Sequence, residues 1–403
     1  MKYSKEEVMQ YVAEEDVKFI RLAFCDVFGK QKNISIMPEE LPRAFEHGIA
    51  FDASAIAGFG DETYSDLFLF PDPETLTWLP WRPEHGKVVR MFCEIRYPDG
   101  RPFECDTRSL LKRAVADAKA SGFTFYFGAE QEFYLFELDE ENQPTNTPYD
   151  RAGYMDIAPE DKGENVRREI CLTLEQMGIR PESSHHEEGP GQNEIDFCYA
   201  DALAAADNVM TFQTVVKTVA RRNGLFADFS PKPLENEPGN GFHINGSVKP
   251  DESSAKLSQM IAGVLAKAVP CTLFFNPTDA SYVRLGQMKA PRYVSWSAEN
   301  RSQLIRVPAA AGEYRRAELR SPDPSANPYI AFALMIWAGL YGIEHGLDLP
   351  KPEDSNLYKA DEATRARLTA LPSDLDAAKA AAASDEFIKA HIPAAIVDIY
   401  CER

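Results

Sequence analysis

The alternation of side chains in residues 123–138, "FTFYFGAEQEFYLFEL", constrains the fold of this chain more than any other feature. A period of two is typical of a β-strand whose two faces meet different surroundings. The pattern places Glu130, Glu132 and Tyr134 on one face, and aromatic and aliphatic side chains with Gln131 on the other. It therefore predicts a sheet with one face in the core and one acidic face.

Three further segments repeat this alternation: "NEIDFCY", "NGFHINGSV" and "RRAELRSPDP". Their polar faces are predicted to carry Glu194, Asp196, Cys198, His243, Asn245, Ser247, Arg316, Glu318 and Arg320. Their apolar faces are predicted to carry Ile195, Phe197, Tyr199, Phe242, Ile244, Val248, Ala317 and Leu319. Each segment alone also fits a structural role, such as a hydrogen-bonded core histidine or a salt-bridged sheet surface. Together they are rich in oxygen ligands with one imidazole, which favours Mg²⁺ or Mn²⁺ over zinc.

The turn before the second of these strands, "HHEEGPGQNEIDF" at residues 185–197, concentrates acceptor groups. A solvated acidic loop would explain the charge. A half-buried carboxylate on the following strand, however, needs a cation or a metal as its partner. For this stretch alone, both a metal site and a plain acidic surface remain open.

Arginines gather in the later part of the chain. The segments "SYVRL", "NRSQLIRVP" and "YRRAELR" supply six of them, namely Arg284, Arg301, Arg306, Arg315, Arg316 and Arg320. Guanidinium groups suit carboxylate and phosphate oxygens. Beside metal-binding carboxylates, they are what phosphoryl transfer needs. The chain has no Walker A and no GxGxxG motif, so we expect any bound nucleotide to lie outside those folds.

Composition narrows the function classes. The net charge of -20 argues against nucleic acid or an anionic membrane as a partner. The cysteines are scattered without a CxxC pair, which argues against zinc and a disulfide framework and fits a reducing cytosol. The N-terminus is charged and does not resemble a signal peptide. The apolar run "YIAFALMIWAGLYGI" is too short to span a bilayer and predicts a buried helix. We therefore expect a cytoplasmic protein.

The length of 403 residues suggests two or three domains. A "PDG" turn is followed by a helical pattern that Asp106 or Thr107 can cap and Gly122 can end. We therefore predict a domain boundary near residue 105, with domains at 1–105 and 106–403. The alanine-rich "LDAAKAAAASDEF" predicts an exposed helix.

At the level of motifs, the chain resembles the glutamine synthetase family, specifically its bacterial type I branch. The matching motifs are "FDASAIAGF", "FGAEQEFYLF", "SSHHEEGPGQNEIDF", "GNGFHINGS", "NPTDASYVRL", "APRYVSWSAENRSQLIRVP" and "RRAELRSPDPSANPY". They occur in the family's order. The resemblance implies an α+β protein with a small N-terminal β-grasp domain and a larger catalytic domain built on an antiparallel sheet. It also implies hexameric rings, usually stacked in pairs, with active sites between neighbouring subunits.

The resemblance also implies roles for individual residues. Two metal ions per site would be held by Glu132, Glu187 and Glu194 and by Glu130, His243 and Glu318. ATP would be contacted by Glu182, Ser247, Arg306 and Arg316, and the acid substrate by Gly239, Arg284 and Arg320. Asp52 from a neighbouring subunit, Tyr154 and Arg301 would take part in catalysis.

Several positions depart from the family pattern. The flap over the active site reads "RLGQMKAP", one residue short, with Lys289 where the family has a glutamate. Ala55 replaces a serine, and Pro238 replaces an asparagine near the amino-acid pocket. The sequence ends at "IVDIYCER" without the tryptophan-containing tail of type I enzymes. From this ending we expect a hexamer, or a dodecamer that dissociates easily.

Three hypotheses follow for the function. The first is an ATP-dependent ligase that joins glutamate, or a close analogue, to a primary amine, with ammonia as a poor substrate. The second is an ordinary glutamine synthetase in which another residue supplies the missing carboxylate. The third is a non-catalytic family member that binds ligands or regulates a partner. The intact set of metal ligands argues against the third.

Overall fold

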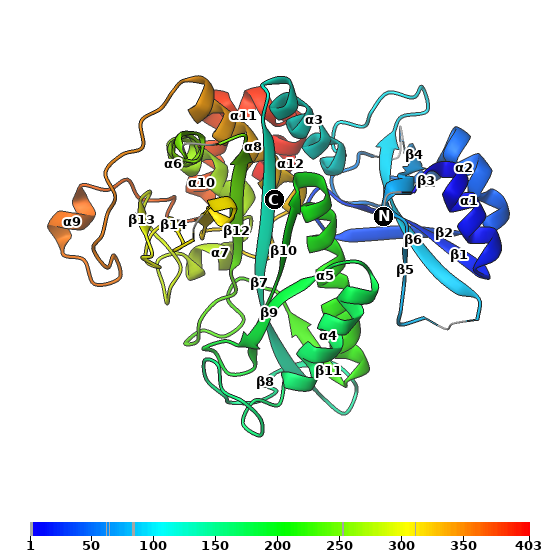
Figure 1. The fold of residues 1–403 in the computed structure, drawn as a ribbon, viewed down its shortest axis with the longest axis horizontal. Coiled ribbons are helices and arrows are strands. Elements are labelled where there is room, and N and C mark those ends of the chain that lie inside the picture. Colours follow the sequence, from blue (N-terminus) through cyan, green and yellow to red (C-terminus); the bar gives the residue numbers. More distant parts are fainter. Residues whose placement is uncertain (1–2, 62, 64, 83–84, 252–253, 311) are drawn as a thin grey trace.

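The computed structural model describes residues 3–403 except 62, 64, 83–84, 252–253 and 311, and it contains two sheets (Figure 1). The smaller sheet has the order β2-β1-β6-β4-β3, with β5 paired to β6. Its strands are β1 (Val17–Cys25), β2 (Gln31–Ile36), β3 (Ile49–Asp52), β4 (Asp66–Pro71), β5 (Thr77–Trp78) and β6 (Lys87–Arg96). Strands β1 and β6 are parallel, and the other pairs are antiparallel. The helices α1 (Lys5–Glu14) and α2 (Leu41–His47) accompany this sheet.

The larger sheet carries the predicted polar strands at its centre, in the order β13-β14-β15-β12-β7-β10-β9. The strands are β7 (Thr124–Leu138), β9 (Pro181–His186), β10 (Gln192–Asp201), β12 (Phe242–Lys249), β13 (Trp296–Ala298), β14 (Ile305–Val307) and β15 (Ala317–Leu319). Two short strands, β8 (Pro144–Pro148) and β11 (Leu225–Asp228), also pair with β7. Apart from the parallel pair β13–β14, the pairing is antiparallel. The predicted α+β class with an antiparallel catalytic sheet is confirmed.

One face of the larger sheet is covered by helices. They include α3 (Thr107–Ala120), α5 (Ala202–Arg222), α6 (Ala255–Phe275) and α8 (Pro328–Glu344). Phe127 of β7 stacks on Phe332 of α8 with ring centroids 4.6 Å apart, and Phe133 of β7 contacts Phe212 of α5. Burying these aromatic side chains is the main force that holds the helices on the sheet.

Two predicted helices are confirmed. Helix α3 begins after Asp106, whose side chain accepts a hydrogen bond from the Arg108 backbone N–H, and it ends just before Gly122. Helix α8 contains the longest apolar run and is buried along almost its whole length. The neighbouring α6 is long and apolar enough to cross a membrane by length and composition, but 72% of that stretch is buried inside the protein. Its apolar surface is therefore explained by packing.

The remaining helices lie around this core. They are α4 (Glu164–Gln176), α7 (Asp279–Arg284), α9 (Glu362–Ala366), α10 (Leu375–Ser384), α11 (Glu386–His391) and α12 (Ala394–Glu402). The alanine-rich segment forms the predicted helix, but the prediction that it is exposed is correct for one side only. In α10, the side chains of Leu375, Ala378 and Ala382 are buried, and the helix packs on α6 and α12. Their spacing of three and four residues places them on one side of the helix.

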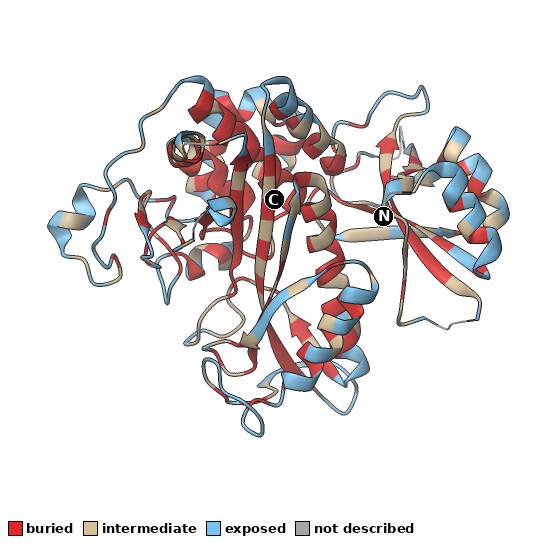
Figure 2. Cartoon of the chain, viewed as in Figure 1, coloured by how far each residue is buried: buried red, intermediate tan, exposed pale blue. Residues whose placement is uncertain are grey.

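The predicted two-faced character of the central strands is confirmed along β7, where buried and partly exposed residues alternate from Phe125 to Phe133 (Figure 2). The prediction fails at Tyr199 of β10. Phe197 pairs with Ala129, whereas Ala200 pairs with Phe127, so β10 contains one extra residue. This bulge reverses the alternation. Tyr199 is consequently 51% exposed instead of facing the core.

Buried polar contacts fix the smaller sheet against the rest of the chain. The guanidinium of Arg108 in α3 lies between Asp72, which follows β4, and Asp207 in α5, at 3.0 and 2.8 Å. The carbonyl oxygen of Val27 accepts hydrogen bonds from the Asn327 amide, at 3.0 Å, and from the Tyr400 hydroxyl of α12, at 3.1 Å. These contacts join segments from both ends of the chain.

Candidate active site

A cavity of about 290 Å³ lies on the polar side of the larger sheet. Carboxylates and imidazoles form one part of its wall, and arginines form another. Its lining residues are Glu130, Glu132, Tyr154, His185, Glu187, Glu194, Asp196, Gly239, His243, Arg284, Met288, Lys289, Ala290, Arg301, Arg306 and Arg320.

The strand register explains why the acidic wall forms. Across the β7–β10 pair, Glu194 lies opposite Glu132, and Asp196 lies opposite Glu130. Across β7–β12, His243 also lies opposite Glu130. Like charges directly opposite each other on one sheet face are destabilising. Two such pairs side by side therefore indicate a function that needs the carboxylates together.

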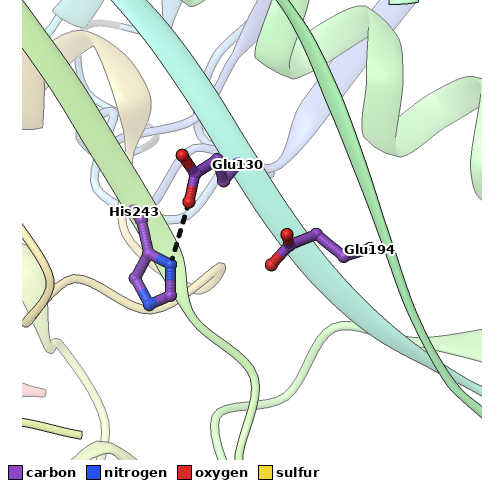
Figure 3. Close-up of side chains that lie close together, drawn as sticks. All are labelled: Glu130, Glu194 and His243. Carbon is purple, nitrogen blue, oxygen red and sulfur yellow. Dashed lines mark hydrogen bonds and ion pairs between the residues drawn. The ribbon is translucent and has the colours of Figure 1, made fainter. Parts of the chain in front are cut away.

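Two groups of side chains bring their possible ligand atoms within 4.8 Å of one another. The first contains Glu130, Glu194 and His243, which project from three adjacent strands (Figure 3). His243 Nδ1 lies 3.3 Å from a Glu130 oxygen. The second contains His185, Glu187 and Glu194, in which His185 Nε2 lies 3.2 Å from a Glu194 oxygen.

Two other predicted ligands have protein partners instead. Glu132 accepts hydrogen bonds from the Gly241 N–H at 2.7 Å and from the Gln192 amide at 3.3 Å. Glu318 is fully buried and forms ion pairs with Arg306 and Arg320, and one of its oxygens lies 3.7 Å from His243 Nδ1. Five of the six predicted ligands thus line the cavity, and Glu318 lies beside His243, where two arginines hold it.

The electrostatics of the acidic wall fit divalent cations. Burial raises the pKa values of Glu132 and Glu187, and burial together with Asp196 raises the pKa of Glu194 well above its usual range. Burial, with a contribution from Glu130, raises the pKa of Asp196 to about 7. The Asp196 Oδ1 atom is also buried without a hydrogen-bond partner. This excess of negative charge is what a bound cation would neutralise.

The histidine of the first group is also suited to a metal. Burial, with a contribution from Arg320, lowers the pKa of His243 to about 4. Its imidazole is therefore neutral near pH 7 and retains a lone pair for a metal. A neutral imidazole among carboxylate oxygens fits Mg²⁺ or Mn²⁺, as expected from the sequence.

The arginine wall is held by backbone carbonyl groups. Arg284, at the end of α7, is buried and donates to the Ser321 carbonyl at 2.8 Å. Arg301 is exposed and lines the same cavity. Arg316 is connected to the acidic wall through Asn245, which accepts from its Nε at 2.9 Å and donates to Glu130 at 2.7 Å. Guanidinium groups in this position suit anionic substrate oxygens.

Gly239 and Tyr154 complete the cavity. A Cβ atom at Gly239 would lie 2.4 Å from the Pro231 carbonyl oxygen, so the chain needs glycine at this close approach. The Tyr154 ring meets the His185 ring edge-on, with centroids 5.4 Å apart.

A buried cluster of Asp150, Asp161 and His186 supports the loop that carries Tyr154. His186 Nε2 lies 2.8 Å from Asp150, and the His186 carbonyl accepts a hydrogen bond from the Met155 N–H. Because Asp161 is also paired with Arg167, we regard this cluster as structural.

Five predicted residues are not part of the lining of this cavity, namely Glu318, described above, and Glu182, Ser247, Arg316 and Asp52. Glu182 is on the exposed strand β9, and Ser247 lines a separate cavity of about 370 Å³ with Arg315. Arg316 is not part of the lining. Asp52 is exposed at the end of β3 in the smaller sheet, where Ser54 donates to its carboxylate at 2.9 and 2.7 Å.

The sequence analysis missed three residues of the site. His185 was not assigned a role, although it lies two residues before Glu187. Asn245 and Gln192 contact predicted ligands directly. The period-two pattern placed Asn245 on the polar face and was a usable signal, whereas nothing in the sequence shows which side chains two strands bring opposite each other.

Comparisons with known proteins agree with this site. Residues 16–98 match the family model "Glutamine synthetase, beta-Grasp domain", and residues 104–403 match "Glutamine synthetase, catalytic domain". The chain is 46% identical over 389 residues to the glutamine synthetase of Clostridium saccharobutylicum, with 93% of this chain and 88% of that protein covered. It is 44% identical over 401 residues to that of Methanosarcina mazei, with 96% and 90% covered. A solved structure of a GmaS/ADP complex superposes with a TM-score of 0.88 at 29% identity, covering 98% of this chain and 94% of that one. The chain belongs to the glutamine synthetase family.

Proposed function

We propose that the protein is an ATP-dependent ligase that joins the γ-carboxylate of glutamate, or of a close analogue, to ammonia or a primary amine. The observation that carries this proposal is a single cavity with a carboxylate–imidazole wall and an arginine wall. Family membership supports it as well. The named relatives include both glutamine synthetases and GmaS, a γ-glutamylmethylamide synthetase. Ammonia and a primary amine are therefore both candidate nucleophiles.

The reaction has two steps. An oxygen of the γ-carboxylate forms a bond to the γ-phosphorus of ATP while the bond between that phosphorus and the β–γ bridging oxygen breaks, which gives an acyl phosphate and ADP. The nitrogen nucleophile then attacks the carbonyl carbon. Inorganic phosphate leaves, and the nitrogen loses a proton.

The arginine wall would hold the anionic groups during both steps. In this proposal Arg284 and Arg320 bind the acid substrate beside Gly239. Arg301 faces the phosphoryl group as its charge moves, because a preorganised guanidinium stabilises developing negative charge. ATP would extend along the sheet toward Arg306, Arg316, Ser247 and Glu182.

The acidic wall would hold two divalent cations, Mg²⁺ or Mn²⁺. The residues available are Glu130, Glu132, Glu187, Glu194, His243 and Glu318, with His185 and Asp196 close by. When bound, such cations neutralise phosphate charge and orient the phosphoryl group for in-line transfer. The same residues would keep the cations close to the arginines of the cavity, such as Arg301 and Arg306.

We also propose a cytoplasmic homo-oligomer, either a hexamer or a dodecamer. Asp52 would be supplied by a neighbouring subunit in this arrangement and would take a proton from the nitrogen nucleophile. Tyr154 would contribute to the binding site of that nucleophile. The division into domains at residues 1–105 and 106–403 is part of the same proposal.

A phosphate-release assay tests the activity. It combines ATP, Mg²⁺ or Mn²⁺, and glutamate with ammonium, methylamine or ethylamine in turn, and it uses Glu132→Ala as the inactive control. We expect phosphate release that requires every component and is lost in the control. If the folded wild-type protein released no phosphate with any pair of acid and nucleophile, a non-catalytic binding protein would be favoured instead.

A further inference from the structure

Two cavities meet at residues 286–289, the middle of the flap. The inner one is the candidate active site, of about 290 Å³. The outer one, of about 600 Å³, is lined by Glu188, Pro238, Gly286, Gln287, Met288, Lys289 and Tyr358. Met288 and Lys289 line both cavities. A small solute that moves between the two cavities at this wall therefore passes beside the flap.

An ion pair joins the flap to the acidic wall. Lys289 Nζ contacts the carboxylate of Glu188, the residue directly after Glu187. The two side chains are 52% and 38% exposed, so the pair lies at the mouth of the site and not in its interior. The Lys289 ammonium also lies 5.7 Å from the centroid of the Tyr154 ring. The Lys289 side chain therefore makes contacts at the mouth of the site instead of pointing only to solvent.

The flap backbone is shaped for this contact. Met288 and Lys289 adopt φ angles of 33° and 72°, in the left-handed region that non-glycine residues seldom occupy. The Gln287 N–H donates to the Arg284 carbonyl at 3.1 Å, and the Ala290 N–H donates to the Gln287 carbonyl at 2.9 Å. The first bond ties the flap to the end of α7, and the second closes a turn within the flap that carries Lys289.

We propose that the Glu188–Lys289 ion pair is an electrostatic gate that determines how the enzyme takes up its nitrogen nucleophile. The proposal rests on the ligase function above. Ammonium and alkylammonium ions arrive with a positive charge. A free carboxylate at the mouth would attract them and a free ammonium group would repel them, whereas the pair does neither.

Because the charges of Glu188 and Lys289 cancel, apolar contacts determine which amine binds best. Tyr154 and Met288 are 48% and 50% exposed beside the gate and offer apolar surface to a small alkyl group. Burying one methylene corresponds to about a fourfold gain in affinity. The substrate class that this mouth favours is therefore a small primary alkylamine over ammonia.

A double-mutant cycle tests the gate. The variants are Glu188→Gln, Lys289→Met and the double variant, and the nucleophiles are ammonium, methylammonium and hydroxylamine, which is uncharged above neutral pH. We expect Lys289→Met to lower KM for both cations by about three- to tenfold and Glu188→Gln to raise it similarly, since each leaves one charge unpaired. The double variant should return to the wild-type KM. In all variants, kcat and the KM for hydroxylamine should stay within about twofold.

A charge-swapped protein, Glu188→Lys with Lys289→Glu, provides the matched control. It keeps a neutral pair and should keep the wild-type KM values. Equal changes for hydroxylamine and the two cations would assign the pair a structural role and overturn the proposal. Unchanged KM values in both single variants would overturn it as well. If the wild-type protein released no phosphate with any nucleophile, the proposed ligase function would be wrong. That result differs from both outcomes above, in which the wild-type protein is active.

Discussion

Two buried glutamates of the site, Glu194 and Glu318, have opposite electrostatic surroundings. Glu318 is fully buried and neutralised by the guanidinium groups of Arg306 and Arg320. Glu194 is also buried, but it lies opposite Glu132 and has no arginine in an ion pair with it among the described residues. Burial and neighbouring carboxylates hold its pKa well above the usual range. Without a cation, its ionised form therefore opposes folding.

These surroundings predict opposite effects of mutation on the metal-free protein. Glu318→Ala leaves the buried Arg320 and the partly buried Arg306 without their shared carboxylate and should lower the free energy of unfolding by about 3–5 kcal/mol. Glu194→Gln removes a repelled charge and should leave the Tm unchanged or raise it. Thermal unfolding with a chelator, and again with Mn²⁺, measures both effects.

Added Mn²⁺ provides the control for this prediction. It should raise the Tm of the wild-type protein, because a ligand that binds the folded state stabilises it. The shift should be much smaller in Glu194→Gln. An equal Mn²⁺ shift in the two proteins would contradict the assignment of Glu194 as a ligand.

The sequence correctly predicted the face on which a side chain lies wherever that face depends only on the residue's own strand. Alternation placed Glu130, His243 and Glu318 on the polar face because each strand has its own period. It could not pair Lys289 with Glu188, which is 101 residues away. It also failed at Tyr199, because a bulge depends on the register of the neighbouring strand.

At the level of elements, the contact between α6 and α8 supports the sheet that carries the site. Gly263 of α6 and Gly342 of α8 face each other where the helices approach most closely. A Cβ atom at Gly263 would lie 2.0 Å from the Ala338 carbonyl oxygen, and one at Gly342 would lie 2.0 Å from the Gln259 carbonyl oxygen. The two backbones touch because neither residue has a side chain.

We predict that Gly263→Ala destabilises the protein even though alanine is the better helix former. The added methyl group must push the helices apart, and overpacking of this kind costs about 1–3 kcal/mol. Helix propensity alone would give a gain of about 1 kcal/mol. The midpoint of thermal unfolding, compared with that of Ala380→Gly on the exposed side of α10, measures the effect. A higher Tm for Gly263→Ala would mean that the helices separate without cost.

At the level of the whole molecule, one predicted catalytic residue is far from the cavity of its own chain. Asp52 ends β3 of the smaller sheet, which lies to one side of the larger sheet (Figure 1). The cavity is lined by residues of the larger sheet and its loops. Arg108, clamped between Asp72 and Asp207, fixes the two parts against each other. Breaking a buried ion pair of this kind costs about 3–5 kcal/mol, so we do not expect Asp52 to swing into its own cavity. If Asp52 acts in catalysis, a second copy of the chain must supply it.

This geometry predicts complementation between two inactive variants. Asp52→Ala lacks the donated carboxylate but has an intact cavity, whereas Glu132→Ala has a defective cavity but can donate Asp52. In a ring with head-to-tail interfaces, each site combines one subunit's cavity with its neighbour's Asp52. Random mixing of equal amounts would make about a quarter of the sites complete, since each of the two required subunits is present with a probability of about one half. We therefore expect each variant alone to be nearly inactive and the co-expressed mixture to recover up to about a quarter of wild-type phosphate release. Light scattering on the same samples checks that both variants assemble. If the mixed oligomers remained as inactive as the separate variants, Asp52 would not be shared between subunits. If the wild-type protein were active as a monomer, a shared site would be excluded altogether.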